Sequence, residues 1–214
     1  MLRNFIITIF SSFLLLTNVN AEKITVFDFT SEEFKTLKVK KVKGETTWTL
    51  DKNKKGNFIK AEAEGKGSGL VKEIKIDLLK TPFINITWKV EKDLSGIIEN
   101  SKKGHDYAAR VFVIKKTGST ALSNRAINYV FSSNNEVGKN WPSPYTKKSI
   151  DYVLSTTQEN LDMWVTVKAN VKEDFMKLHG INVKDISGVA IMTDTDNSKL
   201  KAISYYQNIY FSVK

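Results

Sequence analysis

Short stretches in which hydrophobic and polar residues alternate recur along most of the chain, with turn-forming residues between them. The clearest is Phe83–Glu91, where the even positions from Ile84 to Val90 are apolar and the odd positions from Asn85 onward are polar. A two-residue period predicts a β-strand with one buried face and one wet face. The predicted strands span residues 24–29, 46–50, 57–63, 70–76, 83–91, 104–116, 126–131, 149–154, 163–171, 189–193 and 204–213.

About ten to twelve short strands with turns between them are typical of an antiparallel β-sandwich of jelly-roll type. The sequence therefore predicts an all-β fold of this class. One short helix is predicted at residues 172–179, because Gly180 suits a helix C-terminal cap. Three segments are predicted to lack regular structure: an acidic and then lysine-rich connection at 31–43, a glycine-rich loop at 65–69 and a long irregular region at 133–148.

The N-terminus combines Arg3 with an apolar run and then Val19, Asn20 and Ala21, whose side chains suit a cleavage site. This pattern predicts a secretory signal peptide at residues 1–21. The apolar run is shorter than the roughly 20 residues that a membrane-spanning helix needs, so no transmembrane segment is expected. We predict a mature chain of residues 22–214 that forms one β-sandwich domain and is periplasmic or secreted after cleavage near Ala21.

Residue composition narrows the classes of site that the chain can form. The sequence has no cysteine, which excludes a disulfide framework, a lipidated cysteine anchor and a thiolate metal site. Its formal net charge is +10, but only Arg3, Arg110 and Arg125 are arginines and the other basic residues are lysines. Because arginine is preferred for bidentate recognition of bases and phosphates, we expect no nucleic-acid partner.

Ionisable residues inside the apolar stretch Gly104–Lys116 define the first candidate site. Asp106 and Arg110 are four residues apart, so a strand places them on the same face. A carboxylate and a guanidinium on a half-buried face need partners, and arginine forms bidentate hydrogen bonds with carboxylates or sugar hydroxyls. We predict that Asp106 and Arg110 are ligand anchors, with a structural salt bridge as the alternative. His105 can act as an acid or base near neutral pH, and we predict a smaller role for it than for Asp106 and Arg110.

A second candidate site is the oxygen-rich turn that contains Asp194, Asp196 and Asn197. Alternating side-chain oxygens are ligands that Ca²⁺ uses, but the downstream bidentate glutamate of a calcium-binding EF-hand loop is missing. An Asx-rich turn explains the same residues. We therefore predict polar ligand anchors here and no metal or other cofactor, with calcium at Asp194 and Asp196 as the alternative.

Aromatic residues supply the last candidate. Trp141 lies in the long irregular region with Tyr145 nearby, and we predict that its ring stacks on a sugar, with a packed loop anchor as the alternative. Trp48 and Trp88 are predicted to lie in the core, and Trp164 to be partly exposed. The sequence contains no GxSxG elbow and no P-loop, and its two histidines are far apart. No catalytic residue is predicted.

Three segments together resemble a known family: GHDYAARVFVIKK, WVTVKANVKEDFMKLHG and GVAIMTDTDNSKLKAISYYQNIYF. They resemble the bacterial exported family catalogued as domain of unknown function 3047, in which an acidic pair precedes an alanine-alanine-arginine strand. His105 stands where the first aspartate of that pair is expected. The resemblance implies a sandwich similar to carbohydrate-binding modules and galactose-binding-like domains, and it implies no activity.

The sequence thus predicts a non-catalytic sandwich that binds a carbohydrate or another polar, glycan-like ligand. The predicted anchors are Asp106, Arg110, Asp194, Asp196, Asn197 and Trp141. A jelly-roll polysaccharide lyase or glycoside hydrolase is the first alternative, and it would use Asp106, Arg110, His105 and a tyrosine. A structural envelope protein without a small ligand is the second alternative. The sequence leaves the oligomeric state open.

Overall fold

Two β-sheets face each other across a hydrophobic core in the computed structural model, which describes residues 22–120 and 123–214. The predicted signal peptide lies outside the described residues. Sheet A contains β1 (Lys23–Phe27), β3 (Thr47–Asn53), β4 (Gly56–Glu64), β6 (Phe83–Lys92), β11 (Val165–Asn170) and β13 (Lys201–Ser212). Sheet B contains β2 (Lys38–Lys43), β5 (Gly67–Asp77), β7 (Ala109–Lys115), β8 (Arg125–Ser132), β9 (Asn140–Ser143), β10 (Thr146–Thr156) and β12 (Asp185–Asp194).

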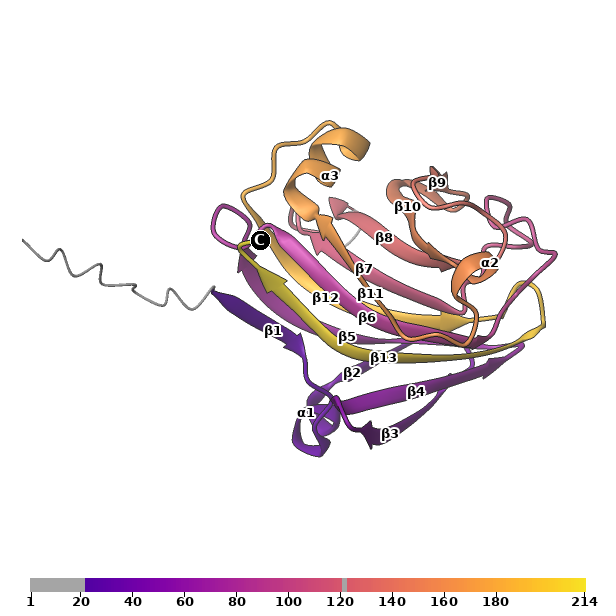
Figure 1. Ribbon diagram of the computed structural model, residues 1–214. Helices are drawn as coiled ribbons and strands as arrows, with labels where there is room; N and C mark the ends of the chain where they lie inside the picture. Colours follow the sequence, from indigo (N-terminus) through magenta and orange to yellow (C-terminus); the bar gives the residue numbers. More distant parts are fainter. Residues whose placement is uncertain (1–21, 121–122) are drawn as a thin grey trace, which may run out of the picture.

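The strand order confirms the predicted sandwich. Sheet A runs β11-β6-β13-β4-β3, with β1 paired along β13, and sheet B runs β2-β5-β12-β7-β8-β10-β9. In Figure 1 the strands of sheet A lie in front of those of sheet B. Neighbouring strands are antiparallel except β8 and β10, which are parallel. Because consecutive elements often lie in different sheets, residues far apart in the sequence meet in space.

The inward-facing side chains of both sheets form the core, and they include Ile59, Ile86, Trp88, Val111, Tyr129, Ile191 and Tyr206. Trp88 is fully buried, and its indole N–H donates to Ser155 Oγ at 3.0 Å, which satisfies a polar atom in apolar surroundings. Trp164 is half-buried, and Trp48 packs against the core from a half-buried position at its edge. The predictions for Trp88 and Trp164 are confirmed.

The predicted helix is confirmed as α3 (Val171–His179), which ends at Gly180 with φ +68° in the left-handed region that glycine favours. Two further short helices were not predicted, α1 (Ser31–Thr36) and α2 (Thr157–Asn160). The start of α1 has a sequence signal, a threonine followed three residues later by a glutamate. Thr30 Oγ1 accepts from the Glu33 backbone N–H at 3.1 Å, and the Glu33 carboxylate accepts from the Phe29 N–H at 2.8 Å.

Part of each segment predicted to be irregular is instead strand. Residues 38–43 form the edge strand β2, all of whose residues are exposed, so its lysines hide the two-residue period while protecting a sheet edge. The presumed glycine-rich loop enters β5 at Gly67, where the residues are buried. Residues 140–143 form β9. These predictions were wrong because local composition does not decide the structure of these segments. The lysines of β2 protect an exposed sheet edge, and the glycines at the start of β5 allow close backbone packing.

Gly67 lies where β5 packs too closely against β12 for a side chain, and this gives a stability prediction. A Cβ added at Gly67 would lie 2.5 Å from Asp194 Cβ, whereas one at Gly188 would meet its nearest atom at 3.3 Å. We expect Gly67→Ala to lower the free energy of unfolding by about 1–3 kcal/mol, the usual effect of overpacking, and Gly188→Ala to lower it less. Urea denaturation of the two variants measures the difference. Equal losses would show that contact with Asp194 is not the cause.

In the part of the chain that the structure describes, no helix has the length and hydrophobicity needed to cross a bilayer.

Candidate functional site

Arg110 and Asp194 form an ion pair that is almost completely buried. In the register of β7 and β12, Arg110 lies opposite Met192, and Asp194 follows two residues later on the same side of its strand. Arg110 Nη2 contacts Asp194 Oδ2, and the two residues are 4% and 1% exposed. Pairing is what allows a guanidinium and a carboxylate to be buried here.

Apolar groups enclose the guanidinium on several sides. Its Cζ atom lies 5.3 Å from the centre of the Tyr107 ring and 5.1 Å from that of the Phe112 ring. Nη2 also contacts Met192 Sδ at 3.4 Å. Arg110 Nε has no hydrogen-bond partner among the described residues. The side chain is thus fixed by stacking as well as by its ion pair.

Burial dominates the electrostatics of the pair. It raises the pKa of Asp194 to about 8, with the charge of Arg110 opposing the shift and the charges of Asp106 and Asp196 adding to it. Burial acts to lower the pKa of Arg110, but the charges of Asp194 and Asp151 outweigh it and leave that pKa raised. The arginine therefore keeps its charge, and Asp194 binds a proton as the pH falls below about 8, so the contact is an ion pair above that pH and a charge-assisted hydrogen bond below it.

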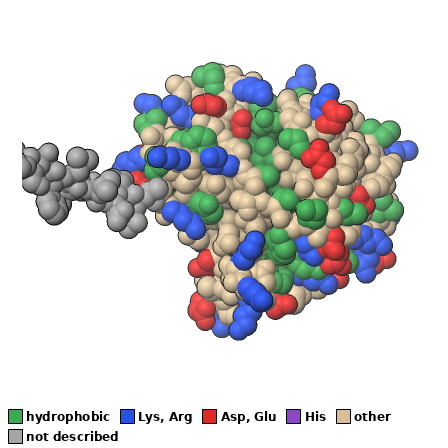
Figure 2. Space-filling view, viewed as in Figure 1, with side chains coloured by type: hydrophobic (Ala, Val, Ile, Leu, Met, Phe, Trp, Pro, Cys, Tyr) green, Lys and Arg blue, Asp and Glu red, His purple; other side chains and the backbone are tan. Residues whose placement is uncertain are grey.

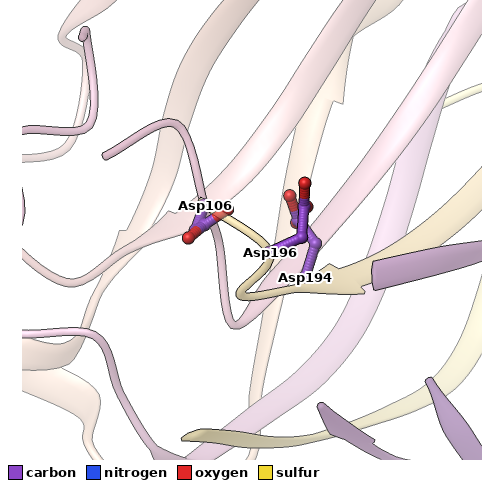
Figure 3. Close-up of side chains that lie close together, drawn as sticks. All are labelled: Asp106, Asp194 and Asp196. Carbon is purple, nitrogen blue, oxygen red and sulfur yellow. The ribbon is translucent and has the colours of Figure 1, made fainter. Parts of the chain in front are cut away.

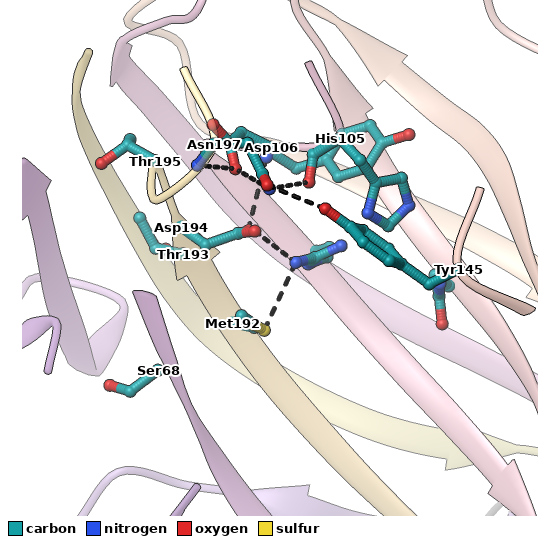
Figure 4. A network of polar contacts seen from close by, with 12 residues as sticks. Ser68, His105, Asp106, Tyr145, Met192, Thr193, Asp194, Thr195 and Asn197 are labelled. Carbon is teal, nitrogen blue, oxygen red and sulfur yellow. Dashed lines mark hydrogen bonds and ion pairs between the residues drawn. The ribbon is translucent and has the colours of Figure 1, made fainter. Parts of the chain in front are cut away.

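Asp106 contacts the turn after β12, but not from the position that the sequence predicted. Strand β7 begins only at Ala109, and the Asp106 N–H donates to the Gly104 carbonyl at 2.8 Å. The prediction that Asp106 and Arg110 share one strand face is wrong, because the chain turns before the strand starts. The Asp106 carboxylate accepts from Asn197 Nδ2 at 2.8 Å and from the Ser198 backbone N–H at 2.6 Å. It fastens the turn to the loop before β7, as Figure 4 shows.

Three carboxylates lie close enough together to hold a metal ion. Oxygens of Asp106, Asp194 and Asp196 lie within 4.8 Å of one another (Figure 3). However, Arg110 and backbone N–H groups already contact Asp194 and Asp106, and only Asp196 has a buried oxygen, Oδ1, without a hydrogen-bond partner among the described residues. The guanidinium already contacts one of the two Asp194 oxygens. Calcium at Asp194 and Asp196 stays an untested alternative.

We expect neither Ca²⁺ nor a chelator to shift the melting temperature, because the Arg110 guanidinium supplies the positive charge that these carboxylates need. Differential scanning fluorimetry in buffers with CaCl₂ or with EDTA measures this. A melting temperature that rises with Ca²⁺ and falls again with EDTA would contradict the expectation and establish a calcium site.

Loop side chains cover the ion pair. Tyr145, in the turn between β9 and β10, places its hydroxyl 2.8 Å from Asn197 Oδ1 and 3.1 Å from the Lys102 carbonyl oxygen. The His105 ring packs edge-on against Tyr145 with centroids 5.5 Å apart, and its Nε2 lies 2.8 Å from Asp151 Oδ2. Figure 4 shows Tyr145 and His105 beside the Asp194 turn. The loops before β7 and after β9 thus close over the pair.

Trp141 lies beside this cluster, on β9. It packs against Tyr107, Val130 and Val153, which are buried. Its Nε1 atom and the Tyr107 hydroxyl are buried without a hydrogen-bond partner among the described residues. The ring is half-buried, so it packs as a loop anchor. Its predicted stacking on a sugar is not tested by this arrangement.

The structure brings five of the six predicted anchors into one network: Asp106, Arg110, Asp194, Asp196 and Asn197. Trp141 adjoins the network through Tyr107. The contacts explain how these residues hold the loops together. Their role as ligand anchors stays a prediction.

A cluster of aromatic residues on the outer face of sheet A was not predicted. Ile59, Trp88 and Tyr206 point into the core, so the strand neighbours Phe58, Lys89 and Tyr205 point outward. Trp164, just before β11, completes the aromatic cluster, which we define as Phe58, Trp164 and Tyr205.

The rings of the aromatic cluster touch one another and are half-buried. Their centroids lie 5.7 Å apart for Phe58 and Trp164, 5.8 Å for Phe58 and Tyr205, and 5.9 Å for Trp164 and Tyr205. Figure 2, which looks onto this side of the molecule, shows hydrophobic side chains among charged ones. One sequence signal pointed to an exposed position for Trp164. It shares a strand face with the polar residues Thr166 and Lys168. The cluster itself depends on which strands are neighbours.

Comparison with known proteins locates the chain in a family. The family model described as "Protein of unknown function (DUF3047)" matches residues 32–210, which confirms the resemblance seen in the three sequence segments. Comparison with curated protein sequences gives no match.

Several solved structures have a similar fold. The family 11 carbohydrate-binding module of cellulase Lic26A-Cel5E of Clostridium thermocellum has 11% identity and a TM-score of 0.47, over 89% of this chain and 94% of that chain. The xyloglucanase domain of NopAA from Sinorhizobium fredii has 11% identity and a TM-score of 0.45, over 79% and 88%. The carbohydrate-binding module CBM29-2 has 10% identity and a TM-score of 0.38, over 91% and 94%. At these identities the similarity concerns the sandwich fold alone.

Proposed function

The chain belongs to the DUF3047 family of proteins of unknown function, and we propose that it is a non-catalytic protein that binds a glycan on the outer face of sheet A. The observation that carries the proposal is the aromatic cluster, in which Phe58, Trp164 and Tyr205 meet on an open sheet face. Aromatic rings offer a large, rigid apolar surface with a negatively polarised face. The C–H groups of a sugar ring suit such a surface.

Charged side chains next to the aromatic cluster provide partners for sugar hydroxyls. Lys89 Nζ lies 4.4 Å from the centre of the Tyr205 ring and 2.7 Å from Asp162 Oδ1, and the Tyr205 hydroxyl donates to Glu91. The Lys89 side chain is half-buried and the Asp162 side chain is exposed, and water screens an ion pair that has an exposed partner, so a ligand hydroxyl replaces Asp162 at small loss. Apolar surface with a few polar groups around it is the usual composition of a binding site.

Affinity electrophoresis in gels that contain neutral or acidic polysaccharides tests the proposal. We expect at least one polysaccharide to retard the protein. We expect Trp164→Ala and Tyr205→Ala each to weaken the affinity about 10-fold, which corresponds to about 1.4 kcal/mol. Tyr210→Ala is the matched control, because Tyr210 lies on the same strand β13, outside the aromatic cluster, and should leave the affinity unchanged.

The same experiment distinguishes the two candidate surfaces. If Trp141→Ala and Asn197→Ala abolish retardation while Trp164→Ala does not, the ligand lies at the anchors predicted from the sequence and not on sheet A. If none of the polysaccharides retards the protein and a glycan array also gives no signal, the glycan-binding proposal fails. A structural envelope protein then becomes the better interpretation.

One observation favours the lyase or hydrolase alternative, namely the buried contact of Asp194 with Arg110, where burial raises the pKa of the carboxyl group. Strongly shifted carboxyl groups next to a specific charge are frequent in active sites. Incubation with polysaccharides, followed by assays for new reducing ends and for unsaturated products, tests this alternative. Turnover that Asp106→Asn abolishes would replace the binding function by an enzymatic one.

We also propose that residues 1–21 direct export, which would bring the sandwich into contact with glycans of the envelope or its surroundings. The proposal rests on three features in order along the chain: Arg3, an apolar run, and a cleavage site with small or short side chains before Glu22. N-terminal sequencing of the protein from a periplasmic extract should give a chain that begins near Glu22. An intact Met1 in that fraction would contradict it.

A further inference from the structure

A groove crosses the outer face of sheet B, on the other side of the sandwich from the aromatic cluster. It has a volume of about 460 Å³ and is lined by residues of β2, β5, β12 and β7. This volume is within the usual range of small-molecule sites. Small residues line its centre, Gly69 on β5 and Gly188 and Ala190 on β12. Since the residues on either side are larger, the sheet face is hollowed between β2 and β7.

The presence of glycine in the floor has a packing reason. A Cβ at Gly69 would lie 2.9 Å from the Ile191 carbonyl oxygen, so β5 and β12 approach each other too closely for a side chain there. Ala190 is 6% exposed and lies opposite Val71 and Phe112 in the strand register. The hollow is therefore a fixed feature of the folded sheet.

The walls of the groove are apolar. Val42 of β2, which is 61% exposed, lies on one side, and Phe112 and Ile114 of β7 lie on the other. Met192 lines the groove near Phe112, and both residues contact the buried Arg110 guanidinium. An apolar groove with a few charged groups at its rim has the usual composition of a small-molecule site.

Lysines give the rim a positive charge. Lys40 and Lys116 line the groove, together with Glu73. Glu73 Oε1 lies 3.2 Å from Lys38 Nζ, and Glu73 Oε2 lies 3.6 Å from Lys116 Nζ. Among the residues that line the groove, Lys40 and Lys116 against Glu73 leave a net charge of +1 at this rim. All four groups are exposed, so the lysines are free to turn towards a bound anion.

We propose that this groove binds a free long-chain fatty carboxylate, with the chain along the apolar floor and the carboxylate at the lysine rim. A glycan fits the groove poorly, because its floor offers few hydrogen-bonding groups and no exposed pair of aromatic rings. A cationic amphiphile has the wrong charge. The proposal is independent of glycan binding on sheet A, since the two surfaces share no residue.

Isothermal titration calorimetry with dodecanoate, kept below its critical micelle concentration, tests the proposal. We expect saturable binding with a stoichiometry near one. Ala190→Leu should weaken it at least 10-fold by filling the floor, and the double variant Lys40→Glu/Lys116→Glu should weaken it about 10-fold by reversing the charge of the rim. Lys54→Glu, an exposed residue in the β3–β4 turn, makes the same type of charge change away from the groove and should bind as the wild type does.

Several outcomes would overturn the proposal. They are the absence of saturable binding, equal affinity for dodecyltrimethylammonium, and equal dodecanoate affinity in Ala190→Leu and the wild type. Binding to phosphatidylglycerol vesicles without binding of free dodecanoate would assign the face to a membrane surface instead. A dimer in sedimentation analysis that Ala190→Leu dissociates, again without dodecanoate binding, would assign it to a second copy of the chain. If circular dichroism shows that Ala190→Leu is unfolded, the double variant Lys40→Glu/Lys116→Glu, whose residues are exposed, tests the proposal without it.

Discussion

Arg110→Ala is expected to lower the free energy of unfolding by about 3–5 kcal/mol at pH 9, where Asp194 is charged, the usual effect of removing one partner of a buried ion pair. The guanidinium is 4% exposed and stacks between Tyr107 and Phe112. Its removal creates a cavity between these rings. It also leaves Asp106, Asp194 and Asp196, whose oxygens lie within 4.8 Å of one another, without the cation that holds them together.

Urea denaturation of the wild type and the variant, followed by circular dichroism, measures this loss. Arg125→Ala is the matched control, because Arg125 is half-buried and its side chain has one hydrogen bond among the described residues, from Nη1 to the Ser123 carbonyl oxygen at 3.3 Å. We expect the control to lose less than about 1 kcal/mol. A loss below about 1 kcal/mol for Arg110→Ala would show that the pair does not fasten the loops.

The second large effect is a pH dependence that belongs to Asp194. Burial raises its pKa in the folded protein to about 8, from 3.8 for an ordinary aspartate. Between these two values the folded protein binds a proton that the unfolded chain has released, so this group's contribution to stability is complete below pH 4 and declines as the pH rises towards 8. The expected decline is up to about 1.4 kcal/mol per pH unit.

Asp194→Asn isolates this contribution, because asparagine has a similar shape and does not titrate. We expect the stability of the wild type relative to Asp194→Asn to fall steadily from pH 4 to pH 8 in urea denaturation at constant ionic strength. All other titrating groups are common to both proteins, so they largely cancel in the difference. A relative stability that rises with pH would mean that the attraction of Arg110 outweighs burial and that the pKa of Asp194 is lowered.

The two predictions together determine what the network of Arg110 and the aspartates is for. A large stability loss with unchanged glycan affinity in Arg110→Ala would identify it as a clasp between the loop before β7 and the turn after β12. Loss of affinity in a variant that is still folded at the assay temperature would support the ligand role that the sequence predicted. The binding surface on sheet A would then need to be reconsidered.

Local patterns in the sequence determined the fold class. The alternation in Phe83–Glu91 became β6, because side chains of a strand must point to opposite faces whatever the neighbouring strands are. Gly180 ended α3 for an equally local reason, its tolerance of positive φ. The oxygen-rich turn at Asp194 followed from its composition. None of these features requires knowledge of a distant residue.

Contacts between distant strands determine which residues meet. Asp194 faces Arg110 because β12 lies next to β7 in a particular register. Phe58, Trp164 and Tyr205 share one surface because β4, β13, β6 and β11 are neighbours. Strand order and register depend on contacts between residues far apart in the chain, which a pattern along the sequence does not contain. Local patterns thus predict a β-sandwich with polar groups in an apolar strand. The packing of its strands decided that those groups lie buried in one network and that the open aromatic surface lies on the other sheet.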